Sequence, residues 1–191
     1  YKNILNLALS GESLDVKIDS LLEYWQDIDE EELFQIADGD EVSSHIAYIL
    51  RNTDLNYQNF WDVAYDTVNH RISLLMDLLD EIGAVLHDNG VKVVALKNAG
   101  ITRGIFPFYA CSPMGDLDLL IDRIDFRKAH DVLINQMGFV FKFRSFLEKE
   151  ILESAIKGGG TEYYKMIGEE KVWVELQWRP VAGRWIQPMN E

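Results

Sequence analysis

The sequence predicts an α+β, two-layer fold in which a helical N-terminal region, residues 1–88, precedes a mixed β-sheet with packed helices, residues 89–191. Three observations predict it. Apolar residues recur at helical spacing up to about residue 87. Asp88-Asn89-Gly90 then forms a strong helix stop, because Gly90 suits the left-handed backbone that ends many helices. Beyond it, short β-rich segments alternate with helical ones, as in a sheet covered by helices.

Helical spacing in the first 51 residues predicts several short helices. Residues 12–26 carry one apolar face, formed by Leu14, Ile18, Leu21, Leu22 and Trp25. The acidic run 27–32 follows it, and a second short helical stretch comes next. Residues 41–51 are predicted as another helix. We therefore expect a helical N-terminal region that packs on the core.

A longer helix is predicted over residues 57–87. Its apolar stripe keeps the helical period throughout, at Phe60, Trp61, Ala64, Val68, Ile72, Leu75, Leu79, Ile82 and Leu86. Stripes of leucine and aromatic residues belong to the core in most proteins. We therefore expect this helix to be buried along one face.

The segments after Gly90 are predicted to build the sheet and its covering helices. Strands are expected at 91–96, 116–121, 139–143, 161–167 and 172–178. Helices are expected at 125–137 and 146–156. The turn Gly158-Gly159-Gly160 separates the last helix from the final two strands.

The formal net charge of −14 is unevenly distributed. Residues 1–60 contain thirteen acidic and three basic side chains, a balance of −10, which leaves −4 for the other 131 residues. A surface this acidic repels phosphate backbones. We therefore do not expect long nucleic acid as a partner. A small nucleotide bound with its own metal ions is compatible with this charge. The acidic N-terminal region is a candidate surface for a protein partner.

Cysteine and histidine usage excludes two kinds of site. The one cysteine, Cys111, rules out an internal disulfide, and the four scattered histidines do not form a zinc motif. We expect each histidine at the surface or at a helix end. No apolar run approaches the roughly 20 residues of a membrane span, and no signal-peptide pattern is present, so we expect no membrane partner and a cytoplasmic location. Because the chain starts at Tyr1 and stops at Glu191 without a helix end, truncation at the C-terminus stays open.

Residues 115–121 place two carboxylates one residue apart inside an otherwise apolar stretch. In a strand, Asp116 and Asp118 would project from one face while Leu117 and Leu119 enter the opposite layer. Two like charges about 7 Å apart at the edge of a core repel each other and lose hydration, unless a cation lies between them. A divalent metal site is one interpretation. The other is a loop-to-strand junction in which Asp118 is merely solvated.

Residues 93–100 combine a buried-looking strand with a small-residue turn, and a helix is expected from Ile101. Such a helix start exposes backbone N–H groups and the positive end of the helix dipole, which together favour phosphate. Lys97 would add a positive charge there. The alternative is a plain turn with a solvated lysine.

Residues 171–178 supply a third carboxylate. On a strand, Glu175 and Gln177 share one face, opposite Val174 and Leu176. A solvated glutamate on an edge strand is the simpler interpretation. A third carboxylate on a neighbouring strand is, however, what a two-metal phosphoryl-transfer site requires.

The three segments resemble the uncharacterised nucleotidyltransferase family of the DNA polymerase β-like superfamily. That family shows a Leu-Lys-Gly turn, an Arg-Pro-Met-x-Asp-hydrophobic-Asp strand and a later Val-Asp-Leu-His-Trp strand. The similar segments here are 96–100, 113–121 and 174–178, within a similarity that covers about residues 60–180. The Asp-x-Asp with its flanks is the most specific part.

The resemblance implies a nucleotidyltransferase-like sheet and a set of site residues. Asp116 and Asp118 would bind two Mg²⁺ ions, or Mn²⁺ in their place. Glu175 would complete the catalytic site and act as the base for the acceptor. The residues implied for the nucleotide are Lys97, Asn98, Gly100 and Gly115.

The leading functional hypothesis is a metal-dependent enzyme that moves a nucleoside monophosphate from an NTP, with ATP favoured, to a small-molecule or protein acceptor and releases pyrophosphate. The present sequence departs from the family pattern at four positions. Asn98 replaces Gly, Ser112 replaces Arg, Glu175 replaces Asp and Gln177 replaces His. These departures motivate the alternative of a catalytically inactive nucleotide-binding or protein-interaction module on the same fold.

A glycosyltransferase is a third hypothesis, because such enzymes also hold a metal with Asp-x-Asp. That hypothesis assigns no role to Lys97 or Glu175. Acceptor specificity is expected to depend on the helical N-terminal region, on Arg179 and Arg184, or on elements beyond Glu191.

Overall fold

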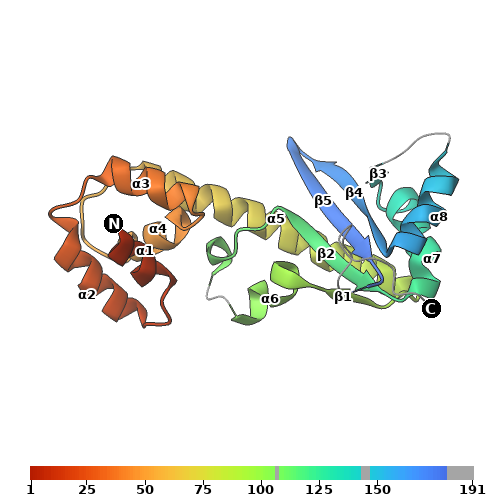
Figure 1. Ribbon diagram of the computed structural model, residues 1–191, viewed down its shortest axis with the longest axis horizontal. Helices are drawn as coiled ribbons and strands as arrows, with labels where there is room; N and C mark the ends of the chain where they lie inside the picture. Colours follow the sequence, from red (N-terminus) through yellow and green to blue (C-terminus); the bar gives the residue numbers. More distant parts are fainter. Residues whose placement is uncertain (106–107, 143–146, 180–191) are drawn as a thin grey trace. The chain divides into compact units, whose positions relative to one another are not determined.

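A computed structural model describes residues 1–105, 108–142 and 147–179. The chain divides into two compact units (Figure 1). The first, the helical unit, comprises Tyr1–Ser73 and Phe106–Pro113; the second, the sheet unit, comprises Leu74–Ile105 and Met114–Glu191. The sequence-based boundary at residue 88 stays a prediction.

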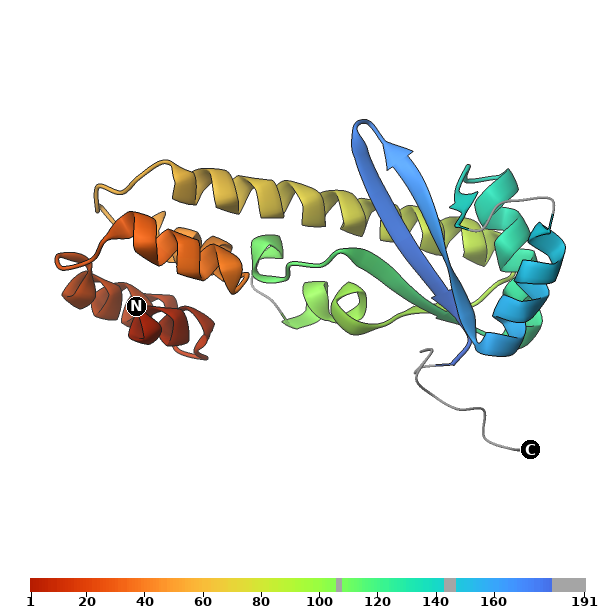
Figure 2. The ribbon, with the colours of Figure 1, turned by 45° about the horizontal axis from the view of Figure 1, so that its top comes forward.

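The helical unit is built from short helices and the first part of a long one (Figure 2). Its helices are α1 Lys2–Leu9, α2 Leu14–Trp25, α3 Glu30–Gly39, α4 Ser43–Leu50 and the beginning of α5 Phe60–Asp88, and the short 3₁₀ helix η1 is Tyr109–Cys111. The predicted helices at 12–26, 41–51 and 57–87 are confirmed, with small differences at their ends. Helix α1 was not predicted; it buries Ile4 and Ala8, a pair too short for a clear periodic signal.

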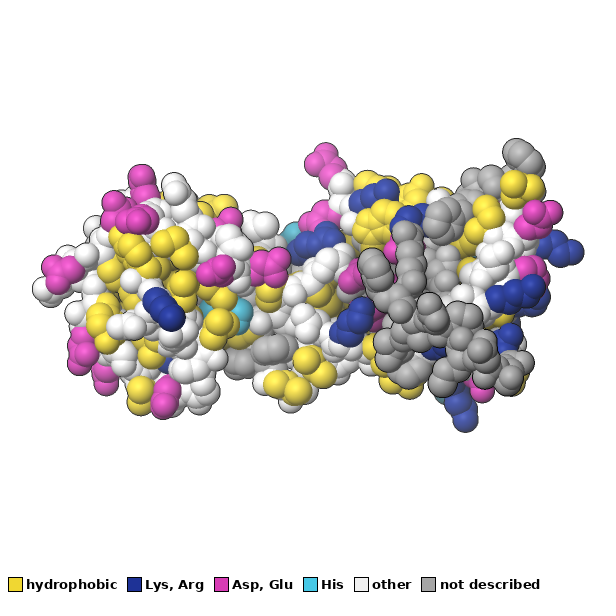
Figure 3. All heavy atoms as spheres, viewed as in Figure 1, with side chains coloured by type: hydrophobic (Ala, Val, Ile, Leu, Met, Phe, Trp, Pro, Cys, Tyr) yellow, Lys and Arg dark blue, Asp and Glu magenta, His cyan; other side chains and the backbone are white. Residues whose placement is uncertain are grey.

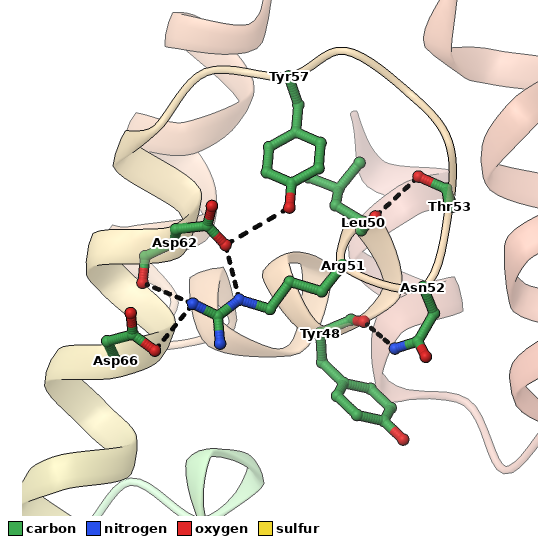
Figure 4. Close-up of polar contacts among 8 residues, drawn as sticks. All are labelled: Tyr48, Leu50, Arg51, Asn52, Thr53, Tyr57, Asp62 and Asp66. Carbon is green, nitrogen blue, oxygen red and sulfur yellow. Dashed lines mark hydrogen bonds and ion pairs between the residues drawn. The ribbon is translucent and has the colours of Figure 1, made fainter.

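Arg51 at the end of α4 ties the beginning of α5 to its own helix (Figure 4). Its guanidinium donates to Asp62 Oδ1 at 2.6 Å and to Asp66 Oδ1 at 2.8 Å. It also lies 4.2 Å from the ring centroid of Tyr65. Because these groups are partly exposed, the contacts fix the geometry of the helix pair more than they add to stability. Burial of Leu21, Leu33, Ile46 and other apolar residues supplies the main stabilisation.

The sheet unit contains a five-stranded mixed sheet. Its strands are β1 Val93–Ala95, β2 Asp116–Ile121, β3 Val140–Phe141, β4 Gly160–Ile167 and β5 Glu170–Gln177. The order is β1-β2-β5-β4-β3, with β2 and β5 parallel and the other pairs antiparallel. The predicted α+β fold with a mixed sheet is therefore confirmed.

Helices cover one face of this sheet. They are the last part of α5, α7 Phe126–Asn135 and α8 Glu148–Gly158, with the short 3₁₀ helix η2 at Arg123–Asp125. On the side of β4 that bears Tyr163 and Lys165, His130 Nδ1 of α7 lies 2.8 Å from the Tyr163 hydroxyl, and Lys165 Nζ lies 3.8 Å from Glu81 Oε1 of α5. Figure 2 shows the β4–β5 hairpin across the last part of α5. None of the described helices combines the length and apolarity of a membrane span.

His130 corrects one sequence-based expectation. It was expected at the surface or at a helix end, but only 6 % of it is exposed. It packs edge-on against Phe141 and bonds Tyr163, so it is a core residue whose polar atoms have partners. Helical periodicity places residue 130 on the inner face of α7, and this signal holds for a polar side chain as well as for an apolar one.

The junction between β1 and α6, Lys97–Ile105, differs from the prediction. The helix begins at Lys97 and not at Ile101, and Lys97 has a positive φ of 50°. The strand is an edge strand rather than a buried one, since Val94 is 58 % exposed. Gly100 lets the first turn of α6 lie against the strand end, because a Cβ there would sit 2.5 Å from the carbonyl oxygen of Ala95.

Gly100→Ala is expected to destabilise the protein by about 1–3 kcal/mol, since its methyl group meets backbone that cannot rotate away. Gly104→Ala in the same helix is the matched control, because a Cβ there meets nothing within 4 Å. That change should be neutral or stabilise by about 0.5–1 kcal/mol. Urea unfolding followed by circular dichroism measures both. Equal effects of the two substitutions would contradict the packing role of Gly100.

Candidate active site

Strands β2 and β5 bring three carboxylates together. Their parallel register pairs Asp118 with Glu175 and Asp116 with Trp173, so these side chains lie on one sheet face. Each of Asp116, Asp118 and Glu175 has one carboxylate oxygen within 4.8 Å of an oxygen of each of the other two. The face they share is opposite the one that α5 and α7 cover, because alternate residues such as Leu117 and Leu119 are fully buried.

Asp118 is the buried member of this acidic triad and is only 3 % exposed. Lys97 Nζ donates to its Oδ1 at 2.7 Å. The backbone N–H of Leu96 donates to the Asp118 carbonyl oxygen at 2.9 Å, which fixes the start of α6 beside β2. The positive φ of Lys97, uncommon for a residue with a Cβ, occurs at this same junction. The local backbone thus places an ammonium group directly beside the triad.

The pKa values of the site show an excess of negative charge. Burial and then the charge of Asp118 raise the pKa of Asp116. Burial, the charge of Asp118 and a hydrogen bond with it raise the pKa of Glu175 to about 7. The hydrogen bond to Asp118 raises the pKa of Lys97. Near neutral pH, a proton on Glu175 therefore relieves repulsion that one lysine does not balance.

The donor set fits a divalent cation that prefers oxygen. Mg²⁺ and Mn²⁺ are bound by carboxylates, and a cation at this point would face three of them. Acidic clusters on a surface are common without any ion, but here Asp118 is buried and the pKa of Glu175 is raised. The Lys97 ammonium, which contacts Asp118, would compete with such a cation for this carboxylate.

The remaining predicted site residues lie around the triad. Lys97 and Asn98 are the first two residues of α6, and Gly115 directly precedes β2. Gly100 is accounted for by its close approach to Ala95. Their predicted contact with a triphosphate stays a prediction. Arg179 lies against Trp178 at 4.4 Å from its ring, and Arg184 lies outside the described residues.

Two of the four departures from the family pattern, Ser112 and Gln177, are buried. Ser112 is 1 % exposed and follows η1 in the helical unit. Gln177 is 2 % exposed and is paired with Gly160 of β4. A Cβ at Gly160 would lie 2.9 Å from the Gln177 Cβ, so the two residues fit each other. Gln177 is therefore a packed residue of the sheet.

Sequence analysis missed a second row of residues on the triad's face. Glu162 of β4 is paired with Glu175, and its charge also raises the pKa of Asp116. Lys142 forms an ion pair with Glu162. Tyr164, two residues after Glu162, is paired with Trp173. Alternation along β4 would have placed Glu162 and Tyr164 on one face, but the pairing of β4 with β5 is needed to bring that face to the triad.

Comparison with known proteins gives a family match. A family model described as an uncharacterised nucleotidyltransferase matches residues 26–189. No curated protein and no solved structure matches the chain. The match spans most of the sequence and includes the three segments that carry the triad and Lys97.

In the metal-free protein, Glu175→Gln should become more stable relative to the wild type as pH rises from 5 to 8. The folded protein retains a proton on Glu175 up to about pH 7, whereas the ordinary pKa is 4.5. Between these values the unfolded chain binds fewer protons, so the wild-type free energy of unfolding falls as pH rises. We expect a divergence of about 1 kcal/mol, because solvent screens this half-buried group.

Urea unfolding in EDTA at several pH values measures this difference. Glu169→Gln, an exposed change in the same hairpin, is the matched control and should follow the wild-type profile. If the Glu175→Gln and wild-type profiles run parallel, Glu175 does not carry the raised pKa.

Proposed function

The chain belongs to the uncharacterised nucleotidyltransferase family, and we propose that it transfers a nucleoside monophosphate from an NTP, with ATP favoured, to a small-molecule or protein acceptor. Pyrophosphate is the leaving group. The observation that carries this proposal is the gathering of Asp116, Asp118 and Glu175 within 4.8 Å on two parallel strands. Family membership gives the reaction class, and the triad supports this location for it.

The carboxylates of Asp116 and Asp118 would hold two Mg²⁺ ions, with Glu175 completing the site; Mn²⁺ suits the same oxygens. Bound Mg²⁺ would neutralise triphosphate charge and lower the pKa of an attacking hydroxyl. Burial of Asp118 and its contact with Lys97 restrict the orientations open to its carboxylate. The protein's own contribution is thus a rigid set of oxygen ligands.

The start of α6 would bind the triphosphate. Its first turn presents backbone N–H groups and the positive end of the helix dipole. In the metal-free protein, the Lys97 ammonium contacts Asp118. With a cation bound to the Asp118 carboxylate, this ammonium would be available to a phosphate oxygen. Asn98 and Gly115 border the same space. Gly100 contributes by letting α6 begin so close to β1.

Glu175 would take the proton of the acceptor hydroxyl. Its carboxylate lies within 4.8 Å of those of Asp116 and Asp118, beside the place where the reacting phosphorus would be held. As the hydroxyl oxygen bonds to the α-phosphorus, the bond from that phosphorus to the pyrophosphate oxygen breaks. The proton moves to the Glu175 carboxylate.

A catalytically inactive binding module is the second candidate. It is favoured by the packed Gln177 and the buried Ser112, which stand where the family pattern has His and Arg. In that case the site would bind a nucleotide without turnover. The acidic residues of 1–60 would then contact a protein partner. For either function we propose cytoplasmic action, where NTP donors are made and used, without long nucleic acid.

Asp116→Asn should abolish Mg²⁺-dependent NTP binding and pyrophosphate release. The loss should exceed the roughly 10–100-fold that removal of an outer-shell partner costs a metal site. The melting temperature should stay unchanged or rise, because the raised pKa of Asp116 means that its charge is unfavourable in the metal-free protein. Asp19→Asn, on the exposed side of α2, is the matched control.

Calorimetry with ATP, GTP, CTP and UTP, each with Mg²⁺, measures binding, and a pyrophosphate assay with an acceptor panel measures turnover. Nucleotide binding without pyrophosphate release would favour the binding module. A fall in stability with unchanged turnover would make Asp116 structural and refute the proposed site.

Lys97→Met should change metal and nucleotide binding in opposite directions. Affinity for Mn²⁺ alone should rise several-fold, because the ammonium that competes for Asp118 is gone. Affinity for a non-hydrolysable NTP at saturating Mg²⁺ should fall, since a phosphate contact is lost. Lys92→Met, an exposed change just before β1, is the control. A parallel fall in both affinities, measured by calorimetry, would show that Lys97 only supports the local structure.

A further inference from the structure

Two aromatic side chains lie next to the acidic triad on the same sheet face. Trp173 is paired with Asp116 on one side and with Tyr164 on the other. The ring centroids of Trp173 and Tyr164 are 5.2 Å apart, and their planes are inclined by 52°. We call these two residues the aromatic platform. Neighbouring strands are about 5 Å apart and alternate residues of a strand about 7 Å, so the platform lies within one small molecule's length of the triad.

Two ammonium groups flank the platform. Lys171 Nζ lies 4.1 Å from the Tyr164 ring centroid and 4.4 Å from that of Trp173. Lys142 Nζ lies 5.7 Å from the Trp173 centroid and pairs with Glu162. In Figure 3, hydrophobic and cationic side chains lie over the β4–β5 hairpin, with acidic side chains at its tip. Glu162 offsets the charge of Lys142, so Lys171 is the main cation that an anion carrying a flat ring would meet here.

A cross-strand aromatic pair needs no ligand to explain it, because such pairs stabilise hairpins by roughly 0.2–1 kcal/mol. The placement of this pair gives it a further meaning. Both rings are only half-buried, and they lie on the face that α5 and α7 leave uncovered. Lys171 lies over both rings, but its long side chain is exposed and can turn toward an anionic group of a ligand. The partly exposed rings can then stack on the ligand ring, a contact worth about 1–3 kcal/mol for a nucleobase.

The platform and Lys97 lie on opposite sides of the triad. Lys97 and the start of α6 approach Asp118 from the β1 side of β2, whereas the platform lies on the β5 and β4 side. Phosphoryl transfer places the attacking and leaving oxygens roughly in line on opposite sides of phosphorus. If the triphosphate lies at α6, the pyrophosphate leaves toward α6. The acceptor then enters over Glu175, on the side of the platform.

We propose that the aromatic platform binds the ring of the acceptor while Lys171 and Lys142 bind an anionic group that this ring carries. The acceptor is thus a small phosphorylated ring compound with a free hydroxyl, such as a nucleoside monophosphate or a sugar phosphate. This inference rests on the proposed function, because it uses the in-line geometry of that reaction. A cationic acceptor is disfavoured, since Lys171 already faces both rings.

The test is ¹⁹F NMR of the full chain labelled with 5-fluorotryptophan, with the Trp173 signal assigned from Trp173→Phe. The protein first receives Mg²⁺ and a saturating non-hydrolysable ATP analogue. The probes are then AMP, glucose 6-phosphate, glucose and inorganic phosphate, titrated separately. The expected result is a saturable shift of the Trp173 signal with one or both ring phosphates, at least tenfold tighter than with glucose or inorganic phosphate.

AMP and glucose 6-phosphate distinguish an aromatic acceptor ring from a sugar ring. Lys171→Gln is an exposed change that removes one charge. It should lower the affinity for the ring phosphates about tenfold and leave the affinity for glucose unchanged. Lys92→Gln is the control and should leave all affinities unchanged. The donor affinity of Lys171→Gln should equal that of the wild type, since the platform lies on the acceptor side.

The outcomes separate this inference from the function on which it rests. Failure of the wild type to bind Mg²⁺ and the ATP analogue, measured by calorimetry, refutes the proposed function. Normal donor binding with a Trp173 signal that no probe moves refutes the platform. Equal affinity for glucose and glucose 6-phosphate refutes the anionic part of the acceptor.

Discussion

The repulsion among three carboxylates, held together by the parallel pairing of β2 and β5, is the constraint on which the rest of the site depends. The register sets Asp118 against Glu175, and neither side chain can leave the shared face without shifting a strand by one residue. Such a shift would expose Leu117 and Leu119, which are fully buried. The hydrophobic core therefore maintains an electrostatic arrangement that is unfavourable by itself.

The junction of β1 and α6 partly compensates this repulsion. Lys97 adopts a positive φ and reaches Asp118, and Gly100 allows the helix to begin within van der Waals distance of the strand end. A non-glycine residue in that backbone region costs free energy, and such residues cluster at binding and catalytic sites. The ammonium group that compensates Asp118 in the metal-free protein is also the group that faces the proposed triphosphate. One side chain thus links metal and nucleotide binding.

Much of this could be predicted from the sequence, because the signals are local. Alternation around Asp116 and Asp118 identified β2, and helical periodicity identified α5 and α7. The start of α6 was misplaced because its first turn has the composition of a loop and its geometry depends on contacts with Ala95 and Asp118. The aromatic platform was missed for a related reason: Tyr164 and Trp173 meet only through the register of a hairpin, which residue types do not reveal.

Fifteen of the eighteen lysine and arginine residues lie beyond residue 60. Residues beyond 60 carry a net charge of only −4, and three of their lysines, Lys97, Lys142 and Lys171, lie on either side of the triad. A site built only to hold a metal needs no such flanks, because cations next to its ligands compete with the ion for the same carboxylates. Positive groups on both sides are useful when anions approach from both sides. The arrangement therefore matches a reaction in which a triphosphate and a second anionic compound meet over the same three carboxylates.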